Sequence, residues 1–95
     1  MEATTRFETE NSTKYLQQLC KHFAHKVDVT LHDTRGECRF SCGTSILTLA
    51  GGGLDIHVEA ENEESLRDTK AVIEDHLLRF AFREAPAPFT WQAVT

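Results

Sequence analysis

Hydrophobic residues recur at helical spacing in the first third of the chain. Over residues 13–25 they fall on one stripe, and lysine, glutamine and histidine occupy the opposite side. This pattern predicts an amphipathic helix with one buried face. Asn11 or Ser12 offers a side-chain oxygen to the free amides at its start. The apolar stripe consists of Leu16, Leu19 and Phe23.

A second helix is predicted after residue 62. Asn62 is a suitable N-cap, and Glu63 and Glu64 lie in the first turn, where the helix dipole favours negative charge. Pro86 and Pro88 prevent the helix from continuing. Its apolar stripe consists of Leu66, Ile73, Leu77 and Phe80.

Between the helices the hydrophobic period changes to two, which indicates strands. Alternating runs cover residues 27–32, 38–42, 47–49 and 54–59, and glycine-containing turns separate them. Shorter alternating runs at 5–8 and 89–91 suggest a first strand and a possible last one. In the registers that we predict for the three hairpins, bulky side chains point to the same face of a four-stranded meander. These registers pair Leu31 with Cys38, Phe40 with Leu47, and Leu49 with Leu54.

The predicted order is therefore β-α-β-β-β-β-α, in a single domain over residues 1–95, with a possible extra C-terminal strand. Each helix has one apolar stripe, and the sheet has one apolar face. Both helices are expected to cover that face of an antiparallel sheet, which makes an α+β fold. The other face of the sheet is left to water or to a partner.

Charge and cysteine content restrict the function. The formal net charge is -5, which disfavours binding to nucleic acid and to anionic membranes. No secretory signal is visible, and no apolar run approaches the ~20 residues that span a bilayer. The three cysteines are an odd number at irregular spacing, as expected for reduced thiols. We therefore expect a cytoplasmic protein.

Three stretches resemble a bacterial family of uncharacterised small proteins, domain of unknown function 2218. They are Tyr-Leu-Gln-Gln-Leu-Cys-Lys-His-Phe-Ala-His-Lys at 15–26, the hairpin at 36–43 with Arg39 and Phe40, and His-Leu-Leu-Arg-Phe-Ala-Phe-Arg-Glu at 76–84. The resemblance implies a fold like that of the TATA-box-binding protein, β-α-β4-α, as in the last domain of phosphohexomutases. Genes of this family often lie near siderophore and iron-uptake genes, so the resemblance also implies a link to iron metabolism. It implies no catalytic residue.

The open sheet face is the predicted binding surface. The registers place Arg39 in one cross-strand row with Thr30, Thr48 and Asp55. His57 and His32 lie in the neighbouring rows. An arginine in this position could bind the carboxylate, phosphate or catecholate of a small anionic ligand. The alternative is a solvated face with a weak Arg39–Asp55 interaction.

A second hypothesis is a metal site. His22 and His25 share a helix face, and His76 on the second helix could supply a third imidazole for zinc or iron. Cys20 points toward the core, where it can pack as a small hydrophobic side chain. Without a fuller ligand set the sequence predicts no cofactor, and the histidines can instead complement the negative end of the helix.

Catalysis is disfavoured, because no nucleophile has an evident neighbouring base. The run Gly51–Gly53 lacks the lysine of a phosphate-binding loop and is better explained as a turn. The sequence thus predicts a small non-catalytic binding or accessory module. Its partner would be a small anionic ligand, another protein or a second copy of the chain.

Overall fold

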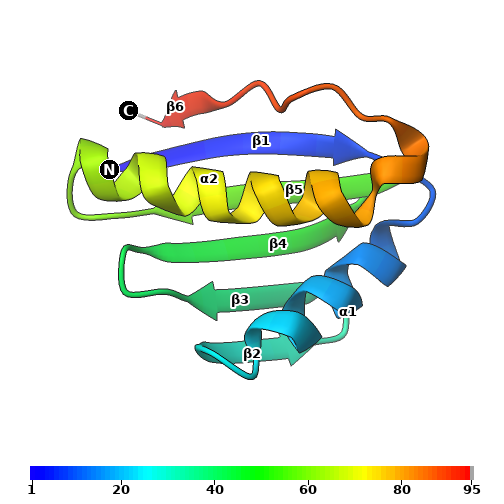
Figure 1. Ribbon diagram of the computed structural model, residues 1–95, viewed down its shortest axis with the longest axis horizontal. Coiled ribbons are helices and arrows are strands. Elements are labelled where there is room, and N and C mark those ends of the chain that lie inside the picture. Colours follow the sequence, from blue (N-terminus) through cyan, green and yellow to red (C-terminus); the bar gives the residue numbers. More distant parts are fainter. Residues whose placement is uncertain (95) are drawn as a thin grey trace.

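A computed structural model describes residues 1–94 and shows a six-stranded antiparallel sheet with two α-helices on one of its faces (Figure 1). The strand order is β2-β3-β4-β5-β1-β6. The predicted α+β class and order of elements are confirmed. The strands are β1 (Glu2–Glu8), β2 (Asp28–His32), β3 (Arg35–Arg39), β4 (Thr44–Ala50), β5 (Gly53–Glu59) and β6 (Gln92–Val94). The helices are α1 (Ser12–Phe23), α2 (Glu63–Phe80) and the short 3-10 helix η1 (Phe82–Glu84).

The first strand is longer than the sequence pattern indicated. Strand β1 pairs with β5 along its whole length and with β6 over Glu2–Thr4. The predicted last strand at 89–91 is wrong in position, because the pairing begins only at Gln92. Residues 89–91 are instead held by their side chains and by the Thr90 carbonyl, which accepts a hydrogen bond from Thr5 Oγ1 at 2.8 Å.

The helix boundaries differ slightly from those predicted. Helix α1 ends at Phe23 instead of His25, because the chain turns there and the amides of Lys26 and Val27 both bond to the Phe23 carbonyl. The N-cap of α2 is confirmed, since the Asn62 side chain accepts a hydrogen bond from the Ser65 amide at 2.8 Å.

Two of the three predicted hairpin registers are wrong. Leu31 pairs with Gly36, because the first turn is a tight one at Asp33–Thr34, with Asp33 in the left-handed region at φ 50°. Phe40 lies in a turn, not in a strand, and its amide bonds to the Gly43 carbonyl at 2.8 Å. The third register, Leu49 with Leu54, is confirmed.

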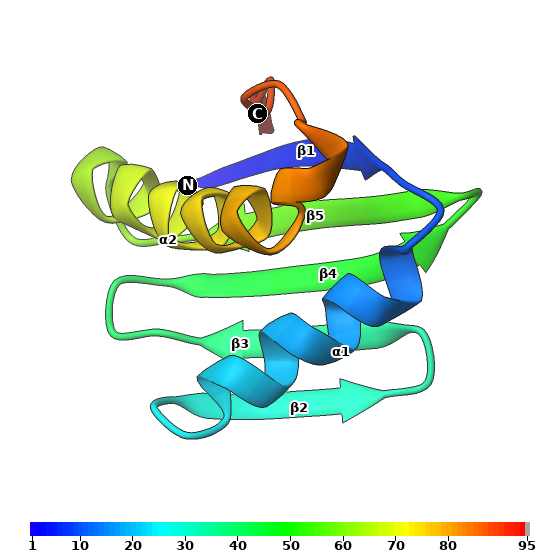
Figure 2. The same cartoon turned by 45° about the vertical axis from the view of Figure 1, so that its right-hand side comes forward.

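Both register errors are an even number of residues, so they leave the faces of the sheet unchanged. Cys38, Leu47 and Ile56 remain beneath the helices and are at most 1% exposed. Helix α1 crosses β2 and β3, and α2 lies along β5 and β4 (Figures 1 and 2). The core between them is built from aliphatic and aromatic side chains of both layers. Its larger members include Leu16, Leu19, Phe23, Leu47, Ile56, Ile73 and Leu77.

Candidate functional site

The C-terminal segment forms a strap that runs back along the outer edge of β1 before it pairs as β6 (Figure 1). The Trp91 indole donates a hydrogen bond to Glu74 Oε1 on α2 at 2.7 Å. The Phe89 ring lies 5.4 Å from that of Phe7, between ring centroids. Residues 86–91 are therefore attached to both layers of the fold, although they form no strand themselves. We call these residues the strap.

Glu84 fixes the start of the strap. Its carboxylate accepts hydrogen bonds from the Tyr15 hydroxyl, from Thr9 Oγ1 at 2.8 Å and from Asn11 Nδ2 at 3.2 Å. These bonds, that of Tyr15 above all, lower the pKa of Glu84 although burial opposes the shift. Asn11, which the sequence suggested as a helix cap, therefore uses its side-chain amide to hold the strap.

A groove of about 780 Å³ lies between the strap and the open face of the sheet. A volume of this size is within the range of small-molecule sites, which is ~300–1,000 Å³. Its floor belongs to β1, β5 and β4, and its wall is the strap. The floor side chains are Thr4, Arg6, Glu8, Ile46, Thr48, Asp55 and His57, and the wall residues include Pro86, Pro88, Phe89 and Thr90.

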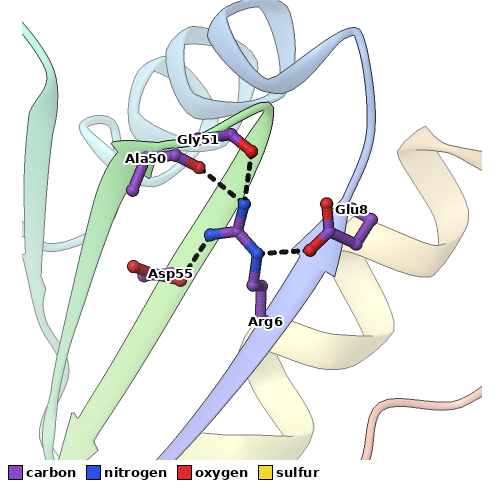
Figure 3. A network of polar contacts seen from close by, with 5 residues as sticks. All are labelled: Arg6, Glu8, Ala50, Gly51 and Asp55. Carbon is purple, nitrogen blue, oxygen red and sulfur yellow. Dashed lines mark hydrogen bonds and ion pairs between the residues drawn. The ribbon is translucent and has the colours of Figure 1, made fainter.

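Arg6 forms one end of the groove, and its guanidinium donates four hydrogen bonds (Figure 3). Its guanidinium donates to Glu8 Oε1 at 2.5 Å and to Asp55 Oδ1 at 2.7 Å. One terminal nitrogen also bonds to the carbonyls of Ala50 and Gly51, at 2.7 and 2.8 Å. The hydrogen bonds to the two carboxylates raise the pKa of Arg6. This guanidinium is therefore part of the frame, joining β1 to β5 and to the β4–β5 turn.

The predicted row around Arg39 is not formed. Arg39 pairs with Asp28 and Thr44, and its guanidinium contacts Asp28 at 3.2 Å, Glu37 at 3.0 Å and Thr30 Oγ1 at 2.8 Å. The register shift of β3 places Arg39 in the cross-strand row of Thr44 and Glu59 instead of the row of Thr48 and Asp55, so no Arg39–Asp55 interaction exists. Arg39 is already surrounded by acceptors on the β2–β3 side of the sheet.

The other predicted face residues separate into two regions. Thr48 and Asp55 are direct cross-strand partners and both line the groove. His57 also lines it, and its Nε2 lies 2.8 Å from a Glu2 carboxylate oxygen and 3.2 Å from one of Glu59. His32 lies at the free edge of the sheet on β2, beyond the groove, with its imidazole 86% exposed.

The open face carries more negative than positive charge. Residues that pair across the strands share a face, so six carboxylates and three arginines lie on this one. The carboxylates are Glu2, Glu8, Asp28, Glu37, Asp55 and Glu59, and the arginines are Arg6, Arg35 and Arg39. Because Arg6 and Arg39 are bonded to these acids, the floor of the groove suits an uncharged or cationic ligand better than an anion.

The predicted metal ligands are only partly brought together. The rings of His22 and His76 lie 5.0 Å apart between centroids, in an aromatic cluster with Phe23 and Phe80. His76 Nδ1 donates to the Val72 carbonyl at 2.7 Å. His25 lies past the end of α1 and is exposed. Among residues 1–94, these three imidazoles do not form a three-ligand group. The group of side chains in residues 1–94 whose ligand atoms lie close enough together to hold a metal ion is Glu2, His57 and Glu59.

Sequence reasoning missed Arg6, Glu84 and the strap. Arg6 stood in the alternating run at 5–8, but its partners come from β5 and from a turn that the pattern could not place beside it. The paired prolines at 86 and 88 were the available signal for the strap, since they favour an extended chain over a helix.

The comparisons agree with this fold. Residues 4–92 match the family of uncharacterised proteins conserved in bacteria, DUF2218, and the chain belongs to that family. The NMR structure of PA4090 from Pseudomonas aeruginosa is similar, with a TM-score of 0.79 and 29% sequence identity. That similarity covers 96% of this chain and 94% of PA4090. No curated protein matches the chain. Within residues 1–94, no helix is both long and apolar enough to cross a membrane.

Proposed function

We propose that this protein is a non-catalytic binding module that holds a small ligand in the groove between the open sheet face and the strap. The observation that carries the proposal is the construction of the groove. Its floor is sheet, Arg6 fixes one end through four hydrogen bonds, and Glu74 and Glu84 anchor its wall. A site assembled before the ligand arrives loses little entropy on binding.

The charge of the groove indicates the ligand class. Glu8 and Asp55 outnumber Arg6 on the floor, while Thr4 and Thr48 offer hydroxyl groups. The sequence suggested a small anionic ligand, but an anion would have to displace Arg6 from its carboxylate partners. We therefore propose a ligand that is uncharged or cationic, with hydrogen-bonding groups on a partly apolar body.

The expected link to siderophores and iron gives a specific version of this proposal. Ferric complexes of trihydroxamates are neutral or cationic, whereas ferric complexes of triscatecholates carry several negative charges. The acidic floor would accept the first class and repel the second. Because the three cysteines are free thiols, we place this binding in the cytoplasm.

The proposal is tested by thermal shift with a ferric trihydroxamate and a ferric triscatecholate. A ligand present at 100 times its Kd adds ~2.7 kcal/mol to the free energy of unfolding, so binding raises the melting temperature. We expect stabilisation by the trihydroxamate alone.

The matched variants are Thr48→Lys on the groove floor and Thr44→Lys on the same strand and face, outside the groove. Thr48→Lys should abolish the thermal shift, and Thr44→Lys should retain it. Equal loss in both variants would mean that the ligand responds to general surface charge. Retention in both would show that it binds elsewhere.

A further inference from the structure

Two of the three cysteines meet beneath α1. Cys20 on α1 is 2% exposed, Cys38 on β3 is 0% exposed, and both are free thiols. Their side chains interact with each other in the layer between α1 and β3. The third cysteine, Cys42, lies apart in the β3–β4 turn, where its sulfur accepts a hydrogen bond from Thr69 Oγ1 at 3.3 Å.

Gly36 creates the space for this contact. A Cβ atom at Gly36 would lie 2.5 Å from Cys20 Sγ, so any larger residue would displace the sulfur. Gly36 and Cys38 are two residues apart on β3 and point to the same face. The Cys20 side chain therefore occupies the gap over β3 that the missing side chain leaves, next to the thiol of Cys38.

A surface groove reaches Cys20 and not Cys38. The groove has a volume of about 390 Å³ and lies between α1 and the free edge strand β2. Leu31 and Val29, which pair with Gly36 and Cys38 respectively, form one wall. The α1 residues that line it are Gln17, Cys20, Lys21 and Ala24. A small molecule in this groove would meet the sulfur of Cys20 first, with Cys38 behind it.

The two thiols lie in different environments. The interaction with Cys38 lowers the pKa of Cys20, although burial opposes the shift. The same interaction, together with burial, raises the pKa of Cys38. Cys20 is also the thiol that lines the groove, so its thiolate, the nucleophilic form, is the one that a small molecule in the groove meets.

We propose that Cys20 and Cys38 form a redox-active dithiol that reacts with low-molecular-weight disulfides entering the groove between α1 and β2. The Cys20 thiolate attacks one sulfur of the disulfide, forms a mixed disulfide and releases one small thiol. Cys38 then gives its proton to the small thiolate released in the first step, and the Cys38 thiolate attacks Cys20 Sγ and releases the second small thiolate, which takes the proton that Cys20 had given to solvent. The protein loses two electrons, the disulfide gains them, and a Cys20–Cys38 bond links α1 to β3.

The test is incubation of the folded full chain with oxidised glutathione, followed by alkylation and peptide mass mapping. We expect a peptide pair joined through Cys20 and Cys38, which reverts with dithiothreitol. In Cys38→Ala the reaction should stop at a glutathione adduct on Cys20. In Cys20→Ala the Cys38 thiol should stay reduced, and the control Cys42→Ala should behave like the unsubstituted protein.

Two results would overturn the proposal. One is a map of the unsubstituted protein in which only Cys42 carries glutathione. The other is alkylation by iodoacetamide at equal rates for Cys20 and Cys38, where we expect Cys20 to react faster because the groove reaches Cys20 and not Cys38. Both measurements use the unsubstituted protein, so they decide the matter even if a cysteine variant fails to fold.

Discussion

Replacing Phe23 with alanine tests the packing of α1 against the sheet. Phe23 is the last residue of α1 and is 4% exposed. Its ring meets that of Phe40 edge to face at 4.9 Å and that of His76 at 4.7 Å, between centroids. The substitution removes a whole buried ring at the place where both helices and the β3–β4 turn meet.

The expected cost follows from this burial. Truncation of a buried phenylalanine to alanine lowers the free energy of unfolding by ~3–5 kcal/mol. The loss of edge-to-face ring contacts, worth ~0.5–1.5 kcal/mol, favours the upper half of that range. Phe40 is only half-buried, so Phe40→Ala should cost less, about 2 kcal/mol. Phe82 is 67% exposed and provides the control, with a change within ~0.5 kcal/mol.

The assay is equilibrium unfolding in urea, followed by circular dichroism. With a slope of ~1–3 kcal/mol per molar urea, a loss of 4 kcal/mol moves the midpoint down by roughly 1.3–4 M. A loss below ~1 kcal/mol for Phe23→Ala would refute the assignment of Phe23 to the core. A loss for Phe82→Ala equal to that for Phe23→Ala would refute it too.

Three further changes have defined outcomes. Arg39→Ala should alter stability by less than ~1 kcal/mol in urea unfolding, because its ion pairs are exposed; a larger loss would contradict its place on the open face. Gly43→Ala should lower the melting temperature, since a Cβ at Gly43 would lie 2.5 Å from Thr69 Oγ1 and would also contact the Glu59 carbonyl; an unchanged melting temperature would refute the close approach. Burial, with neighbouring cations, lowers the pKa of His22. The unfolded state therefore binds more protons, and the free energy of unfolding should fall as the pH drops below the ordinary histidine pKa of ~6.5. His22→Gln should remove that part of the pH dependence, and an unchanged pH profile would contradict the reasoning.

The fold was predictable because the alternation of side chains between the two faces of a strand is a robust signal. Although the turns at Asp33–Thr34 and 40–43 shifted two registers, both shifts were even, and Cys38 and Leu47 stayed beneath the helices. Hydrophobic alternation sets the face of each residue but not its cross-strand partner. Partner identity depends on turn length, and composition specifies turn length only weakly.

The candidate site was less predictable for the same reason. Placing Arg39 beside Asp55 required a correct register, whereas the actual partner of Asp55 is Arg6 from a strand far away in sequence. The strap has no hydrophobic period, and its position depends on hydrogen bonds that the carboxylates of Glu74 and Glu84 accept. The contact of Cys20 with Cys38 depends on the absence of a side chain at Gly36, which only coordinates reveal as a close approach.

Amide chemical-shift mapping tests most directly whether the groove between the strap and the open sheet face is the binding site. The probe is the diamagnetic gallium(III) complex of a linear trihydroxamate, titrated into ¹⁵N-labelled protein. We predict shifts at the amides of Thr4, Thr48 and Thr90, with Leu31 on the far edge of the sheet unchanged. Shifts confined to the α1–β2 side, or none at all, would contradict the account.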